Sequence, residues 1–243
     1  MFQGLFNYDN PVWRFIGKLG DLVLLNLLWL ICCIPVFTAA ATTAVYYVTL
    51  KLVRDDDGST IKSFFHSFTQ NFKQATAIWL MILVAGGLLG FDLWFLMSGV
   101  VTVSTVVKTV MSAVFGAMTL ILLFVTTYIF PLQARFYNTV KRTLFNAFFM
   151  SVRHLLQTIS MLIIDGLVVA GVYVALYMVP QVSMLLLLFG FPLIAFINSY
   201  FFTEIFKKYI PKEEDQEHSN GISPLLDENN QEIEDAIQSL KGK

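Results

Sequence analysis

Residues 22–53 read LVLLNLLWLICCIPVFTAAATTAVYYVTLKLV, an apolar run with few polar side chains and with Pro35 near its middle. As one helix, this run would be about 48 Å long, whereas the hydrocarbon core of a bilayer is about 30 Å thick. Proline removes a backbone donor and disfavours helical geometry at the residue before it. We therefore predict a helix break at Pro35, with membrane spans at residues 17–34 and 36–54.

Four longer apolar runs follow, at residues 75–97, 105–129, 155–179 and 183–206. Each is long enough to cross a bilayer alone. The chain of 243 residues is 56% hydrophobic and 14% charged, with a mean hydropathy of +0.68, whereas a soluble domain is about 45–50% apolar and about 25% charged. The predicted fold is an all-α, multi-pass transmembrane bundle at residues 1–211, followed by a largely disordered acidic cytoplasmic tail at 212–243.

The distribution of Lys and Arg predicts the topology. These residues cluster at 51–73, 135–153 and 207–212, and Arg14 and Lys18 flank the first span, whereas the connections at 98–104 and 180–181 carry no charge. Because Lys and Arg are enriched in cytoplasmic loops, six crossings place both termini in the cytoplasm. The first two runs are short and contain several Thr and Ala. Five crossings, or a first hairpin that re-enters without crossing, therefore remain alternatives.

The first two predicted cytoplasmic loops each have the pattern of an amphipathic interfacial helix. In the first loop, aromatic residues recur at helical spacing, namely Phe64, Phe65, Phe68 and Phe72. In the tail, three lysines stand against nine acidic residues, and Ile233, Ile237 and Leu240 could form one face of a short helix. These apolar positions either anchor the loops in the headgroup layer or dock a cytoplasmic partner.

Polar residues inside the spans are candidate functional residues, because a charge at the bilayer centre costs about 2.5–3.5 kcal/mol on the insertion scale. Asn26, Asp165 and Asn198 each lie about nine or ten residues from the cytoplasmic end of a predicted span, or about 14 Å deep. We predict one polar cluster, either a helix clamp or a site for a substrate, proton or ion. Asp92 and Lys108 are predicted to form an ion pair near the outer end.

Sequence motifs for catalysis are lacking. The chain has no phosphate-binding loop, dinucleotide glycine pattern, HExxH or GxSxG, and its three His residues are scattered. We expect no enzyme activity, no cofactor and no metal site. The chain also lacks an arginine-rich stretch interleaved with aromatic residues, so we expect no nucleic-acid partner.

Two segments carry a resemblance to a known family. The first segment resembles the YesL-type bacterial membrane proteins. It runs from Asn26-Leu27-Leu28-Trp29 through Pro35-Val36 to Tyr46-Tyr47, and on to Asn71-Phe72-Lys73-Gln74. Residues 130–136, FPLQARF, are similar to a second signature of that family. The resemblance implies a multi-pass protein of the bacterial cytoplasmic (inner) membrane, often encoded beside sugar ABC importers, and implies no catalytic or binding residues.

Three functions follow as hypotheses. The leading one is a non-catalytic accessory component of oligosaccharide uptake of the ABC type, with permease or ATPase subunits as partners. The second is a small secondary permease with a titratable Asp165. The third is a membrane scaffold or regulator without a transported substrate. Besides the lipid bilayer, a second copy of the chain is a candidate partner.

Overall fold

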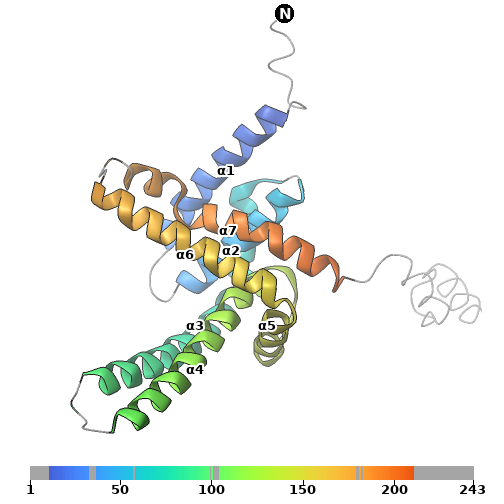
Figure 1. Ribbon diagram of the computed structural model, residues 1–243. Coiled ribbons are helices and arrows are strands. Elements are labelled where there is room, and N and C mark those ends of the chain that lie inside the picture. Colours follow the sequence, from blue (N-terminus) through green and yellow to red (C-terminus); the bar gives the residue numbers. More distant parts are fainter. Residues whose placement is uncertain are drawn as a thin grey trace, which may run out of the picture. The chain divides into compact units, whose positions relative to one another are not determined.

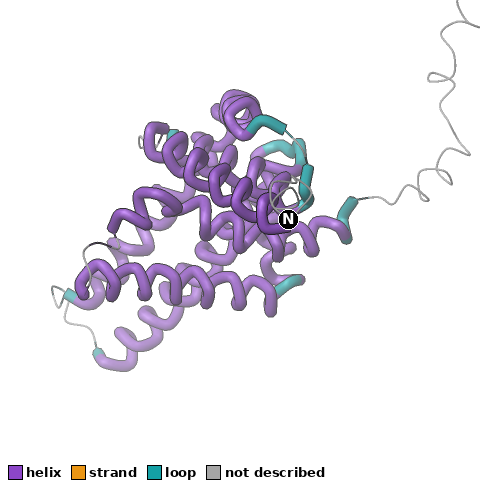
Figure 2. Tube along the Cα trace, turned by 90° about the horizontal axis from the view of Figure 1, so that it is seen from above, coloured by secondary structure: helices purple, strands orange, loops and turns teal. Residues whose placement is uncertain are grey.

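The computed structural model describes residues 11–32, 37–56, 58–98, 100, 104–178, 181 and 183–210. Within these ranges the chain forms seven α-helices and no β-strand, which confirms the predicted helical class (Figure 1; Figure 2). The helices are α1 (Pro11–Cys32), α2 (Thr38–Val53), α3 (Thr60–Met97), α4 (Thr105–Arg135), α5 (Val140–Arg153), α6 (Leu155–Met178) and α7 (Ser183–Lys207). Contacts divide the chain into two units, Met1–Glu204 and Ile205–Lys243.

Five of the helices in the described ranges are long and apolar enough to cross a membrane, so this is a helical membrane protein. The candidate spans are Val12–Cys32, Thr60–Met97, Thr105–Arg135, Leu155–Met178 and Leu188–Lys207. The predicted span at 36–54 is the exception. It forms α2, which has 16 residues and is about 24 Å long, less than the thickness of the hydrocarbon core. Eleven residues of α2 are buried, so this helix lies inside the bundle.

The first two helices form an antiparallel hairpin. α1 ends at Cys32 and α2 begins at Thr38, which confirms two helices, although Pro35 itself lies outside the described residues. At one end of the hairpin, Arg14 and Lys18 of α1 each form an ion pair of 2.8 Å with Asp55, which follows α2. At the other end, Trp29 Nε1 donates to Thr42 Oγ1 at 3.3 Å. The start of α1 and the end of α2 therefore lie at the same end of the bundle.

α3 corrects one prediction. The sequence suggested an interfacial helix at the aromatic residues and a separate span from residue 75. The structure has one continuous helix of 38 residues instead, about 57 Å long. The junction reads Phe72-Lys73-Gln74-Ala75 and contains no Pro or Gly, so nothing in it interrupts the helical hydrogen bonds. The second amphipathic segment does form a separate helix, α5, and its place at the membrane interface stays a prediction.

The aromatic residues at the start of α3 take part in internal packing. Phe64 is fully buried, and its ring stacks on that of Phe68. Phe68 and Phe72 contact Phe37, just before α2, with ring centroids 6.4 and 5.4 Å apart. The expectation that these residues dock a partner is therefore wrong for Phe64, because its side chain has no free surface. Phe65 remains 44% exposed.

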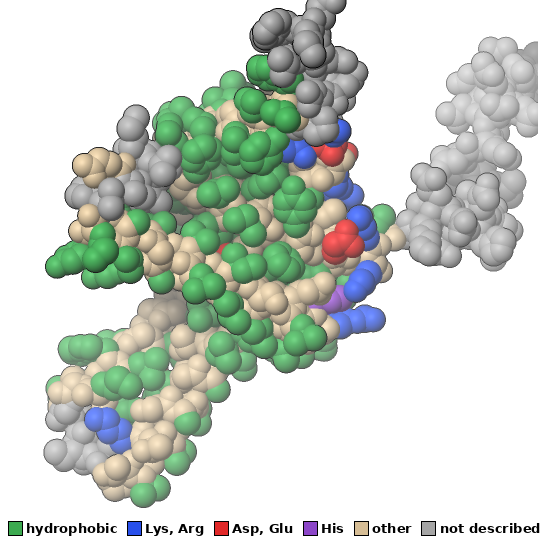
Figure 3. Space-filling view, turned by 45° about the horizontal axis from the view of Figure 1, so that its top comes forward, with side chains coloured by type: hydrophobic (Ala, Val, Ile, Leu, Met, Phe, Trp, Pro, Cys, Tyr) green, Lys and Arg blue, Asp and Glu red, His purple; other side chains and the backbone are tan. Residues whose placement is uncertain are grey.

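α3 and α4 lie side by side as a long hairpin (Figure 1; Figure 2). Large apolar side chains on the outer faces of these helices are exposed, among them Leu83, Val84, Leu88, Phe91, Val106, Val110 and Val114. Hydrophobic side chains also cover most of the face seen in Figure 3, where charged side chains gather along one side. Apolar patches of this extent are typical of surfaces that contact lipid or other proteins.

Candidate functional site

The candidate site is a polar contact between α6 and α7. The Asn198 amide of α7 donates to both carboxylate oxygens of Asp165 on α6, at 2.9 and 3.1 Å. Asn198 is fully buried, and Asp165 is half-buried. The structure thus brings together two of the three residues that the sequence singled out. Because one amide group satisfies both oxygens, the contact fixes the relative register of the two helices.

α2 joins this contact from a third side. The Tyr46 hydroxyl interacts with the Asn198 side chain and lies within electrostatic range of Asp165. One turn further along α2, the Thr49 hydroxyl forms a hydrogen bond of 2.8 Å with the Ser199 hydroxyl. Both pairs are buried, so the polar groups of α2, α6 and α7 meet inside the bundle. We call Tyr46, Thr49, Asp165, Asn198 and Ser199 the polar cluster.

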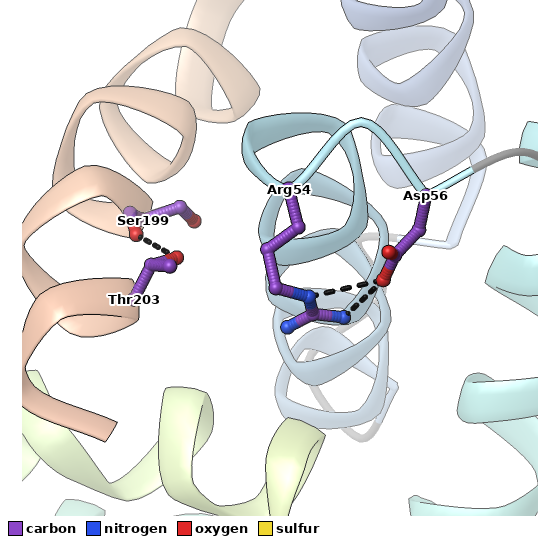
Figure 4. Close-up of polar contacts among 4 residues, drawn as sticks. All are labelled: Arg54, Asp56, Ser199 and Thr203. Carbon is purple, nitrogen blue, oxygen red and sulfur yellow. Dashed lines mark hydrogen bonds and ion pairs between the residues drawn. The ribbon is translucent and has the colours of Figure 1, made fainter. Parts of the chain in front are cut away.

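Hydroxyl groups of α7 extend the polar face of the cluster. Ser199 Oγ donates to the Ala195 carbonyl oxygen, and Thr203 Oγ1 donates to the Ser199 carbonyl oxygen, both at 2.7 Å. Figure 4 shows the second of these bonds within the helix, together with the Arg54–Asp56 pair that follows α2. Bonds to the carbonyl four residues back are the usual solution for a Ser or Thr hydroxyl away from water.

Asn26 of α1 is buried, as expected for a cluster residue, but it lies elsewhere along α7. Its nearest neighbour there is Gly190, where an added Cβ would stand 2.5 Å from Asn26 Oδ1. Gly190 precedes Asn198 by two helical turns, or about 12 Å. The predicted common depth is therefore wrong for Asn26. α1 begins at Pro11 and not at residue 17, so a count from residue 17 placed Asn26 too close to the cytoplasmic end.

Gly190 makes the close approach of α1 and α7 feasible. Its φ of 34° and ψ of −133° are not helical, so α7 is kinked there, and Pro192 follows within the same helix. The next residue, Phe191, stacks on Trp29 of α1 at 5.2 Å and meets Tyr46 of α2 edge-on at 5.9 Å. The rings of Trp29, Phe191 and Tyr46 therefore pack together between Asn26 and the rest of the polar cluster.

Asp165 has no basic partner in the part of the chain that the structure describes. Three ion pairs join Arg14 and Lys18 to Asp55, and Arg54 to Asp56. They lie at one end of the bundle, near the turn between α2 and α3. Among the described residues, the carboxyl group of Asp165 accepts its hydrogen bonds from the Asn198 amide.

The predicted ion pair between Asp92 and Lys108 is not formed among the described residues. Both side chains are half-buried and belong to the α3–α4 hairpin. Counting along the helices gave them similar depths, but each residue also turns the helix by about 100°. Equal depth therefore does not place two side chains on facing sides. Ile233, Ile237 and Leu240 of the tail lie outside the described residues.

Sequence reasoning missed Tyr46, Thr49 and Ser199. The available signal was the spacing Tyr46–Thr49, which places two polar groups on one face of a helix. α2 is apolar or small on all sides, however, so its own pattern does not identify the face that meets α7. Groups of three or more His, Cys, Asp or Glu placed to hold a metal ion do not occur within the described ranges.

Comparison with known proteins assigns one stretch of the chain to a protein family. Residues 22–93 match the family described as "Protein of unknown function, DUF624", which is the YesL-type family. This stretch contains the second half of α1, all of α2 and most of α3, including Asn26, Tyr46 and Thr49. No curated protein and no solved structure matches the chain. The resemblance seen in the sequence is thus confirmed, and the chain carries an uncharacterised YesL-type domain, DUF624, at residues 22–93.

Proposed function

We propose that this protein is a non-catalytic accessory component of ABC-type oligosaccharide uptake in the bacterial cytoplasmic membrane. One observation carries the proposal most: residues of the polar cluster bind one another. Asn198 occupies both oxygens of Asp165, and Thr49 bonds to Ser199. The cluster then acts as a clamp between helices, and the outer faces remain for contact with partner subunits. The family resemblance supports the link to carbohydrate import.

The topology that fits this role has both termini in the cytoplasm. Its support is the antiparallel α1–α2 hairpin, whose two outer ends meet at the Arg14–Asp55 and Lys18–Asp55 pairs. The chain leaves the hairpin on the side where it entered, whether or not the hairpin crosses fully. α3, α4, α6 and α7 then add an even number of crossings, and the Lys- and Arg-rich segments face the cytoplasm.

The test is purification of the full chain from its native host in nanodiscs, with identification of every co-purifying protein. We expect ABC permease or ATPase subunits in stoichiometric amounts. A tail variant with Ile233→Glu and Leu240→Glu tests whether the tail makes the contact. Its matched control, Asn230→Asp with Gln238→Glu, adds the same charge and keeps both apolar residues. Recovery of the chain alone, or with copies of itself only, would refute the accessory role.

A secondary permease is the second candidate, because Asp165 is a half-buried carboxyl group without a basic partner among the described residues. Intramembrane carboxyl groups of this kind serve as proton relays in pumps and transporters. In proteoliposomes, a permease would show solute flux that Asp165→Asn abolishes. An accessory component would show no flux by itself, and Asp165→Asn would leave uptake by the complete system unchanged.

A further inference from the structure

A cavity of about 190 Å³ lies where α2, α3 and the end of α4 meet. Its lining includes Tyr47 of α2, Gln70 and Asn71 of α3, Gln133 and Arg135 of α4, and Tyr137 just beyond. The volume corresponds to about six water molecules in the liquid. The cavity therefore suits one small polar group and is too small for an oligosaccharide.

Gln133 is the most unusual residue of this cavity. Its side chain is 5% exposed, and neither its amide nitrogen nor its amide oxygen bonds to any group of the described chain. Buried amides without partners are rare in folded proteins, because the lost contacts with water are not replaced. A side chain of this kind in a cavity wall indicates that something outside the chain supplies the missing partner.

Two further donors line the same cavity. Gln70 Nε2 donates to the Tyr137 hydroxyl oxygen at 2.7 Å, so the hydroxyl hydrogen of Tyr137 remains available to a ligand. Arg135 is exposed at the last residue of α4 and takes part in none of the ion pairs defined in the described ranges. Its guanidinium group offers several donors in a planar arrangement that matches a phosphate.

Basic side chains outnumber acidic ones around the cavity. The Lys51 ammonium group lies 5.9 Å from the centre of the Tyr47 ring, and Arg54 lies within electrostatic range of Arg135. Asp56 is nearby but already binds Arg54 through two hydrogen bonds. Lys51 and Arg135 are thus left to attract an anion.

We propose that this cavity binds a phosphate group, carried either by an anionic phospholipid headgroup or by a soluble phosphate ester. Arg135 supplies the charge, and Gln133 and Tyr137 supply neutral donors. Arg135 ends a candidate span, so the cavity lies where the apolar part of α4 stops and headgroups begin. Basic pockets between membrane helices at this level bind anionic headgroups in general. The proposal is independent of the uptake role and of the polar cluster.

The two sources of phosphate are separated by two probes on the purified full chain. Native mass spectrometry measures bound phosphatidylglycerol, with diacylglycerol as the uncharged control. Thermal unfolding in detergent measures stabilisation by glycerol 3-phosphate, with glycerol as the control. Arg135→Gln should weaken binding of the phosphate probe about tenfold or more, because it removes a charge-assisted contact. Arg142→Gln, which removes a charge outside the cavity, should have no such effect.

Gln133→Leu provides a second variant whose result does not depend on charge. This substitution should weaken binding of the phosphate probe. The stability of the ligand-free chain should equal or exceed that of the wild type, because a buried amide without partners is removed. Binding of phosphatidylglycerol alone would identify a lipid site, and binding of glycerol 3-phosphate would identify a soluble ester. The proposal is overturned if neither probe binds, or if Arg142→Gln weakens binding as much as Arg135→Gln.

Discussion

The Asn198 amide binds both oxygens of the Asp165 carboxyl group. Breaking this contact should lower the free energy of unfolding by a measurable amount. Asn198→Leu leaves Asp165 half-buried without its donors, so we expect a loss of about 1–3 kcal/mol in the free energy of unfolding. Asp165→Asn is the matched control, because two amides can still pair across the same interface. Thermal unfolding in detergent would measure both. Equal stability of Asn198→Leu and the wild type would argue against a clamp.

Asp55 combines an unusual backbone with two basic partners. Its φ of 55° lies in the left-handed region, which Asp and Asn adopt more readily than most residues. A hydrogen bond from Lys18, and then the neighbouring Arg14, hold the pKa of the Asp55 carboxyl below its ordinary value. A lowered pKa means that the stabilisation is complete at neutral pH and is lost in the acidic range, as the pH falls through the lowered pKa.

Asp55→Asn keeps the turn and removes the ion pairs. We expect a small loss of thermal stability at pH 7, because water screens exposed ion pairs. This difference from the wild type should disappear in the acidic range, where the wild-type carboxyl group is protonated as well. Melting curves of both proteins at low salt, between pH 7 and pH 3, would measure it. A difference of unchanged size throughout this range would show that the turn itself, and not the ion pairs, was affected.

At the level of elements, the kink of α7 depends on one glycine. Gly190→Ala places a Cβ 2.5 Å from Asn26 Oδ1 and in a backbone conformation that side chains rarely adopt. We expect a loss of about 1–3 kcal/mol from the backbone conformation alone, with the clash in addition. Gly87→Ala on α3 is the control, because nothing lies within 4 Å of its added Cβ. Similar unfolding temperatures for the two variants would contradict this role of Gly190.

Helix breaks were predictable from the sequence where the chain carries a chemical signal. Pro35 indicated the break between α1 and α2, and both helices are present on either side. Pro131 shows the limit of that signal, because α4 continues past it to Arg135. No signal marked the junction at Phe72-Lys73, where composition changes from amphipathic to apolar while the backbone stays helical. A change of environment along a helix does not require a change of conformation.

The common depth of Asp165 and Asn198 was predictable from the sequence, whereas the depth of Asn26 and the contacts of α2 were not. Asp165 and Asn198 were paired correctly because the predicted cytoplasmic ends of their spans, at residues 155 and 206, lie within one residue of the observed helix ends. Asn26 was misplaced because α1 begins earlier than its apolar run. Tyr46 and Thr49 were missed because α2 is covered on almost every side, so no exposed face reveals which side chains meet α7. Contacts between helices depend on packing that a single sequence does not specify.

For the whole molecule, the topology makes a direct prediction. In a background with Cys32→Ala and Cys33→Ala, we introduce Ser98→Cys after α3, Ser59→Cys before α3 and Tyr137→Cys after α4, all at exposed positions. A membrane-impermeant maleimide added to intact cells should label only Ser98→Cys. The other two should react after the membrane is permeabilised. Labelling of Ser59→Cys in intact cells would invert the proposed topology.

The length of α3 has a mechanical consequence. The helix is nearly twice as long as the hydrocarbon core is thick, and it runs without interruption from the residues that pack on α2 to the hairpin with α4. A tilt of about 5° about one end displaces the other end by about 5 Å over this length. A rearrangement that tilted α3 about its Thr60 end would therefore move the Ser98 end of the helix by this distance.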